Sequence, residues 1–167
     1  MHIIVSLLFM IVAFKWGDLK NWKLYYPTIL YFAIGDLAYN FLTCNNPLWI
    51  YESPIFTHTF SDLLVLSIAF PSFVLVFLPH YPDGFMNQII YIGICVFICS
   101  ILEYISYSLG YFSYHNGWSI WWSAILYCIA FPLLILHYKK PLLVWPISIV
   151  LALGTLLLFD IPLKILK

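Results

Sequence analysis

Apolar runs with almost no charge follow one another along the whole chain. A helix needs about 20 consecutive apolar residues to cross the hydrocarbon core of a membrane, so runs of this length constrain the fold more than any other feature. The first run is the weakest, because Lys15 and Asp18 shorten its apolar stretch. The pattern predicts an all-α integral membrane bundle of about six transmembrane helices, at about residues 2–19, 24–43, 58–78, 87–109, 118–137 and 141–160.

The composition excludes several classes of protein. Hydrophobic residues make up 64% of the chain and charged residues 8%, whereas a soluble domain has about 45–50% and about 25%. The chain therefore has too little polar surface to face water on all sides. The net charge is zero and all seven basic residues are lysines, so the basic surface that nucleic-acid binding requires is missing.

Connections between the runs are short and contain turn-forming residues, as in Asn45-Asn46-Pro47 and His115-Asn116-Gly117. None is long enough to separate two domains, so we expect one transmembrane helical domain over residues 1–167. The first run does not look like a secretory signal, because no lysine precedes it and no small-residue cleavage site follows it. We expect it to be retained as a helix.

The lysines predict the orientation. With six spans, five lysines share one face of the membrane, and only Lys164 and Lys167 lie on the other. The five are Lys15, Lys20, Lys23, Lys139 and Lys140. Loops rich in lysine stay in the cytoplasm, so we expect both termini outside the cytoplasm in a cell membrane. If the last segment folded back instead, five helices would span and the C-terminus would be cytoplasmic; six are preferred because residues 141–159 carry no charge.

Three carboxylates fall inside the predicted spans, where an ionisable side chain is costly and is a functional candidate by default. Asp36, Asp62 and Glu103 all fall in the outer half of the bilayer, although they are far apart in the sequence. Asn40 follows Asp36 by one turn, and His58 precedes Asp62 by one turn. His115 lies in a nearby external turn. The candidate ligand-binding residues are therefore Asp36, Asn40, His58, Asp62, Glu103 and His115.

Imidazole and carboxylate groups together bind cations, relay protons or act as acid and base. We expect binding or transport of a cation, a proton or a small polar solute at an outer-leaflet polar pocket. One alternative is an intramembrane enzyme acting on a lipid, with His58 or Glu103 as base and Asp62 orienting the imidazole. Another is an accessory subunit of a membrane complex or a homo-oligomer, in which these polar groups only fix helix packing. No catalytic, cofactor or metal motif selects among them.

Other polar residues have simpler expected roles. His80 and His137 fall at the inner boundary of the membrane, where we expect them to snorkel toward water. Tyr39 and Tyr104 could donate hydrogen bonds to the carboxylates, although filling of apolar space is the commoner use of such rings. Cys95 and Cys99 are four residues apart and so share one face of a helix. Two thiols in this arrangement are more typical of small packing residues than of a soft-metal site.

Four stretches of the sequence resemble an uncharacterised family of small polytopic membrane proteins from spore-forming Gram-positive bacteria. They are Trp22-Lys23-Leu24-Tyr25-Tyr26-Pro27-Thr28, Gly35-Asp36, Leu78-Pro79-His80-Tyr81-Pro82 and His115-Asn116-Gly117-Trp118. The resemblance covers roughly residues 20–145. It implies a bacterial cytoplasmic membrane and carries no activity.

Overall fold

The apolar runs form helices, since a helix pairs every interior backbone N–H and C=O group within the run itself. The computed structural model describes residues 1–162, so Lys164 and Lys167 lie outside the described residues. The elements are α1 (His2–Trp16), α2 (Trp22–Leu42), β1 (Trp49–Tyr51), α3 (His58–Leu64), the π-helical turn η1 (Val65–Ala69), α4 (Phe70–Phe77), α5 (Phe85–Ser108), β2 (Phe112–Tyr114), α6 (Ile120–Lys139) and α7 (Pro141–Leu158).

The predicted helical organisation is confirmed. α3, η1 and α4 form one continuous rod, so the described chain has six helical segments, whose ends lie within three residues of the predicted ones. The wide turn η1 comes just before Pro71, whose ring nitrogen has no hydrogen to donate. α7 is a single uninterrupted helix and does not fold back on itself. The two short strands, β1 and β2, were not predicted from the sequence.

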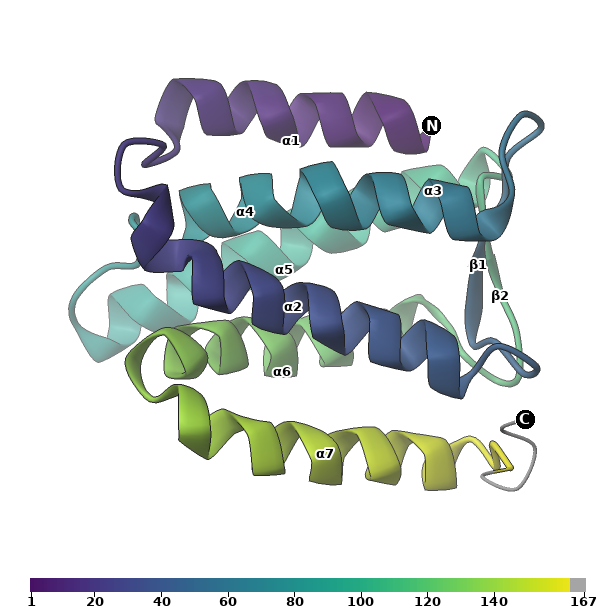
Figure 1. Ribbon diagram of the computed structural model, residues 1–167. Helices are drawn as coiled ribbons and strands as arrows, with labels where there is room; N and C mark the ends of the chain where they lie inside the picture. Colours follow the sequence, from purple (N-terminus) through teal and green to yellow (C-terminus); the bar gives the residue numbers. More distant parts are fainter. Residues whose placement is uncertain (163–167) are drawn as a thin grey trace.

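The helical segments run back and forth along one common direction, so the bundle has two distinct ends (Figure 1). We call one the lysine end: α1 and α6 finish there, α2 and α7 begin there, and it carries Lys15, Lys20, Lys23, Lys139 and Lys140. We call the other the sheet end, where β1 and β2 lie beside the start of α3. The lysines that the structure describes therefore lie together at one end of the bundle.

Two apolar clusters hold the bundle together. The larger one joins α2, α4, α6 and α7 in the half toward the lysine end, with Phe77, Leu134 and Val144 almost completely buried. The smaller one, around Leu48 and Trp118, lies at the sheet end. Buried polar side chains, among them Asp62, Glu103 and Ser123, lie in the same half of the bundle as the smaller cluster.

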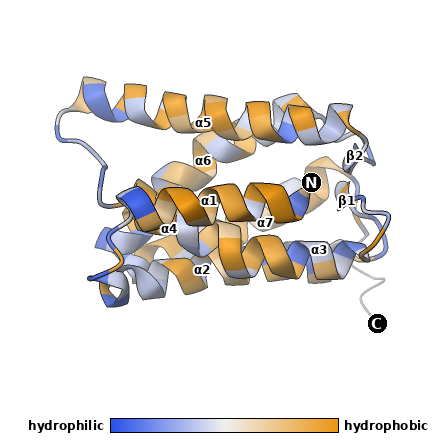
Figure 2. Cartoon of the chain, turned by 90° about the horizontal axis from the view of Figure 1, so that it is seen from above, coloured by the Kyte–Doolittle hydropathy of each residue, from blue (hydrophilic) through white to orange (hydrophobic). Residues whose placement is uncertain are grey.

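The outside of the bundle is apolar along the helices and polar mainly at the loops (Figure 2). Large apolar side chains such as Phe97 and Leu142 stand exposed on α5 and α7. Within residues 1–162, four helices are long and apolar enough to cross a membrane: His58–Phe77, Phe85–Ser108, Ile120–Lys139 and Pro141–Leu158. α1 is shorter, with 15 residues. α2 has 21 residues but carries more polar groups.

β1 and β2 form a small antiparallel sheet that closes the sheet end of the bundle. Trp49 pairs with Tyr114, and Tyr51 pairs with Phe112. The Tyr39 hydroxyl on α2 accepts hydrogen bonds from the backbone N–H groups of Leu48 and Trp49, and its ring stacks on Trp49 at 3.7 Å between centroids. This contact fixes β1 against the end of α2.

Candidate functional site

The structure brings together two of the three carboxyl groups that the sequence singled out. Asp36 on α2 and Asp62 on α3 interact directly through their side chains. Asp62 is 4% exposed, and one oxygen of Asp36, Oδ2, is buried without a hydrogen-bond partner. Besides the two carboxyl groups themselves, His58 is the titratable side chain that acts on the pair.

Asn40 is the residue that ties this pair to its surroundings. It lies one turn after Asp36 on α2, and its Nδ2 donates to Asp62 Oδ2 at 3.0 Å and to the Asp36 carbonyl at 3.1 Å. Its Oδ1 lies 3.2 Å from His58 Nε2. One amide therefore bridges α2 to two groups on α3, and the spacing of Asp36 and Asn40 along the helix makes this possible.

The hydrogen bonds of His58 define its protonation. The backbone N–H of Tyr51 donates to His58 Nδ1 at 3.0 Å, so that nitrogen carries no proton. The proton of the neutral ring is then on Nε2, which donates to Asn40 Oδ1. Both ring nitrogens are engaged, and the imidazole reaches Asp62 through Asn40 rather than by the direct contact that their spacing suggested.

The donors around Asp62 also indicate where a shared proton lies. A hydrogen bond between two carboxyl groups needs one proton, because two ionised carboxylates can only accept. Asp62 already accepts from Asn40, which suits the ionised partner. Asp36 keeps a buried oxygen without a donor, which costs a neutral acid much less than a carboxylate. The arrangement therefore places the proton on Asp36.

Glu103 does not join this pair but has its own partners. The hydroxyl of Tyr114 on β2 donates to Glu103 Oε1 at 2.7 Å, and the hydroxyl of Tyr127 on α6 donates to Oε2. Burial and this bond to Glu103 raise the pKa of Tyr114. Two phenol donors satisfy both oxygens of a carboxylate, so Glu103 joins α5, α6 and β2 at the sheet end.

Tyr51 on β1 lies between the two carboxyl sites. Its ring packs between His2 on α1, at 4.7 Å between centroids, and His58, at 5.7 Å. Burial and the nearby carboxyls of Asp36, Asp62 and Glu103 raise its pKa well above the ordinary value for tyrosine. The phenol therefore stays protonated and is a potential donor between the sites.

His115 lies outside the buried cluster, in a second polar group at the surface. Its Nε2 is 2.9 Å from the Ser113 hydroxyl, which donates to Glu52 Oε1 at 2.8 Å. The Glu52 backbone carbonyl lies 3.1 Å from Nε2 of His2, which is buried. Polar groups thus extend from the exposed turn at His115 toward the interior.

Sequence reasoning missed the tyrosines that matter here. Tyr104 is exposed, and the Tyr39 hydroxyl accepts a hydrogen bond from the backbone N–H of Leu48. Tyr114 and Tyr127 are the residues that donate to the Glu103 carboxylate. Tyr51 and Tyr114 belong to strands of three residues each, which are too short to show a period in the sequence. The buried His2 was missed because it begins a weak apolar run.

A separate polar group lies toward the lysine end. His137 is 4% exposed, its Nδ1 lies 3.1 Å from the Thr28 hydroxyl, and its ring stacks on Tyr31 at 4.3 Å. The Tyr31 and Ser148 hydroxyls are 2.7 Å apart. The expectation that His137 snorkels is therefore wrong, because facing helices enclose the ring and supply its partner. His80 is exposed, as expected of a boundary residue.

Neither a metal site nor a similarity to known proteins indicates a function for the described residues. Within residues 1–162, no group of three or more His, Cys, Asp or Glu side chains is arranged to hold a metal ion. Cys95 and Cys99 are free thiols on α5, packed beside the larger apolar cluster. Comparison with protein-family models, curated proteins and solved structures finds no match.

Proposed function

We propose that this chain is a multi-pass membrane protein that crosses the bilayer six times as one helical domain. The apolar exterior and the four long apolar helices support this proposal. α2 is long enough to cross the bilayer. Its polar residues Asp36 and Asn40 face the interior of the bundle, so they do not contact lipid. α1 rises about 22 Å, which a locally thinned bilayer or its flanking polar residues can accommodate.

The orientation follows from the two ends of the bundle. The lysine end is cytoplasmic by the positive-inside rule, so the sheet end and both chain termini are extracytoplasmic. The resemblance to small polytopic proteins of spore-forming Gram-positive bacteria supports a location in the bacterial cytoplasmic membrane. The carboxyl pair then lies in the outer half of the bilayer, below the cap formed by β1 and β2.

The carboxyl pair acts as a proton-binding site, which takes up and releases a proton on the outer side. This binding is one step in the transport of protons across the membrane. The observation that carries this function is the direct contact of Asp36 with Asp62, with one buried oxygen left unsatisfied. Such a pair holds one proton tightly and responds to any movement that separates α2 from α3. Asn40 and His58 keep Asp62 in place as the acceptor.

The contacts favour a proton over the other candidates. A metal ion or polar solute needs several free ligand atoms, but Asn40, His58 and Glu103 use their polar atoms on one another or on neighbouring groups. General-base catalysis by His58 needs a free ring nitrogen, and both are engaged. An accessory role in a complex would leave the proton without a function.

Infrared spectroscopy of the protein in lipid nanodiscs tests this function, because a protonated carboxyl group has a C=O stretching band that a carboxylate lacks. We expect such a band at neutral pH, and its loss in Asp36→Asn. Asp83→Asn, at an exposed position in the loop before α5, is the matched control and keeps the band. A band that survives in both Asp36→Asn and Asp62→Asn would refute proton binding by the pair.

Proton movement is measured separately, with the protein in liposomes that enclose a pH-sensitive dye. An imposed pH gradient should dissipate faster with the native protein than with Asp36→Asn or Asp62→Asn. Equal rates for all three proteins, together with a normal infrared band, would show a bound structural proton and no transport.

A further inference from the structure

The histidines at the sheet end differ in what their ring nitrogens face. His2 Nε2 lies 3.1 Å from a backbone carbonyl, and His115 Nε2 lies 2.9 Å from a serine hydroxyl. Both partners can accept a hydrogen bond, so these contacts survive when the ring gains a second proton. His58 is different, because its Nδ1 accepts from the backbone N–H of Tyr51 at 3.0 Å. A backbone N–H can only donate, so protonation of His58 Nδ1 breaks this contact.

The bond between Tyr51 and His58 holds one end of β1. In the part of the chain that the structure describes, it is the one hydrogen bond that joins β1 to α3. The other end of the strand, at Trp49, is fixed from two sides. The Tyr39 hydroxyl accepts from the Trp49 N–H, and Tyr114, which pairs with Trp49, donates to a carboxylate of α5. Loss of the bond to His58 therefore frees the Tyr51 end of β1 from α3, while the Trp49 end stays anchored.

The free end of β1 would lie beside the carboxyl pair. Burial and the nearby carboxyl groups, chiefly Asp36 and then Asp62, raise the pKa of Tyr51, so its phenol lies close to both. The His58 ring is connected to the same pair, because its Nε2 donates to Asn40, which donates to Asp62. A change at His58 Nδ1 therefore acts where the sheet meets the carboxyl pair.

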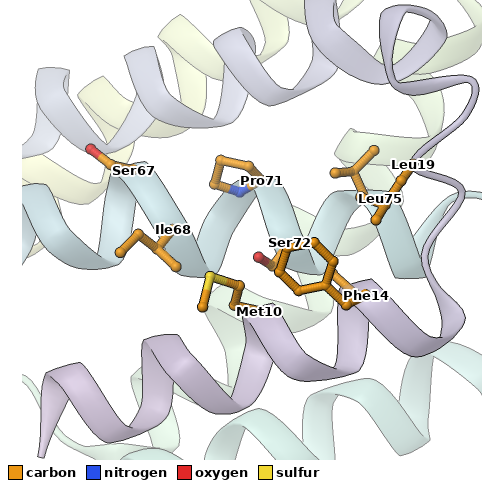
Figure 3. A pocket seen from close by; sticks show the side chains of 9 residues that line it. Met10, Phe14, Leu19, Ser67, Ile68, Pro71, Ser72 and Leu75 are labelled. Carbon is orange, nitrogen blue, oxygen red and sulfur yellow. The ribbon is translucent and has the colours of Figure 1, made fainter.

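A groove beside α1 offers no comparable route to the pair. It lies between α1 and the rod formed by η1 and α4 and has a volume of about 200 Å³. Met10 and Phe14 line it on α1, and Pro71 and Leu75 line it on α4 (Figure 3). This mainly apolar lining favours hydrocarbon over water and protons. The polar groups at the sheet end are a better entrance.

Charged groups on three elements face the His58 ring. Asp62 on α3 and Glu52, which follows β1, attract a positive charge on the ring, whereas burial opposes it. His2 on α1 repels the ring when both carry the charge. α2 contributes an uncharged amide, and β1 contributes the uncharged phenol of Tyr51. The ring is partly exposed, so water on the outer side can protonate it in the range of about pH 8 to 5 in which histidine changes charge.

We propose that His58 is a pH-sensitive latch, which releases Tyr51 when water outside the membrane protonates Nδ1 and so opens the carboxyl pair to protons from that side. The proton comes from the outer water and stays on Nδ1, and the Tyr51 N–H turns to water. Deprotonation of the ring restores the bond and closes the cap. The role as a gate rests on the proposed proton transport, whereas the latch itself depends only on the contact between Tyr51 and His58.

Hydrogen–deuterium exchange with mass spectrometry, on the full chain in lipid nanodiscs, tests the latch. The readout is the protection of the Tyr51 amide at about pH 8 and about pH 5, corrected for the intrinsic exchange rate. We expect the protection to fall about 10-fold on acidification, which corresponds to the loss of one strong hydrogen bond inside the bundle. His58→Asn keeps an acceptor oxygen for Tyr51 but cannot be protonated, so its protection should be equal at both pH values. The matched control, His115→Gln, changes an exposed histidine at the same end and should keep the native response.

Nuclear magnetic resonance of the native protein with isotope-labelled histidine reads the protonation of His58 Nδ1 directly. A doubly protonated His58 ring with unchanged protection of the Tyr51 amide would contradict the latch, even if His58→Asn failed to fold. A response of His58→Asn equal to that of the native protein would contradict it too.

Asp36→Asn separates the latch from the proton site, because it leaves His58 and Tyr51 in place. We expect this variant to lose the infrared band of the protonated carboxyl group and to keep the pH response of the Tyr51 amide. A native band that is lost in Asp36→Asn, together with a native Tyr51 amide that does not respond to pH, would exclude the latch and leave the proton site standing. A responsive amide in a native protein without the band would support the latch and exclude the proton site.

Discussion

Asn40→Ala is the substitution whose effect on stability can be worked out most directly from the structure. The side chain makes two hydrogen bonds between helices, one to Asp62 and one to His58. Its third bond, to the Asp36 carbonyl, lies within α2 and supports the backbone only weakly. Removing the amide takes one of its donors from the buried Asp62 carboxylate, which keeps its contact with Asp36, and leaves the His58 Nε2–H without its partner.

Interhelical hydrogen bonds in membrane proteins contribute about 0.6 kcal/mol on average and about 1.7 kcal/mol at most. Two such bonds predict that Asn40→Ala lowers the free energy of unfolding by about 1 to 3 kcal/mol. Because Asp62 is buried and accepts as a carboxylate, we expect a value in the upper half of that range.

Reversible unfolding in mixed micelles, followed by circular dichroism, measures this change. Asn21→Ala is the matched control, because Asn21 also donates to an aspartate at 3.0 Å but is exposed. We expect no measurable loss there, since water replaces the lost partner. If Asn40→Ala were no more destabilising than Asn21→Ala, the hydrogen-bonded bridge between α2 and α3 would be refuted.

Three other predictions concern different parts of the fold. Tyr127→Phe should destabilise the protein by about 1 to 2 kcal/mol because Glu103 loses a phenol donor, whereas Tyr104→Phe, exposed on α5, should have no effect in the same unfolding assay. Thr28→Val keeps the side-chain shape but removes the partner of His137, so it should cost about 1 kcal/mol, and a stability equal to the native value would contradict the buried contact. Alkaline phosphatase fused after Lys167 should be active, because we expect the C-terminus outside the cytoplasm. A fluorescent protein inserted at Asp83 should fluoresce, because we expect that loop in the cytoplasm. Fluorescence of the same protein fused at the C-terminus would exclude six crossings.

The sequence alone was enough to predict the helical segments and the sorting of the described lysines to one end. Both depend on local properties: the length of an apolar run, the turn-forming residues after it, and the alternation of direction between successive helices. This is why the ends of α2 and α5 could be predicted to within three residues. The same alternation predicted that Asp36, Asp62 and Glu103 would share one end of the bundle.

Only the tertiary structure decided which of these groups meet. The rotation of each helix about its own axis brings Asp36 to Asp62 and turns Glu103 toward Tyr127, and no local pattern records that rotation. β1 and β2 add Tyr51 and Tyr114 to the site through long-range pairing that strands of three residues cannot signal. His137 shows the same limit, because its burial depends on Thr28 and Tyr31 from another helix. Hydrophobicity along the chain determined the helices, whereas packing between them determined the chemistry.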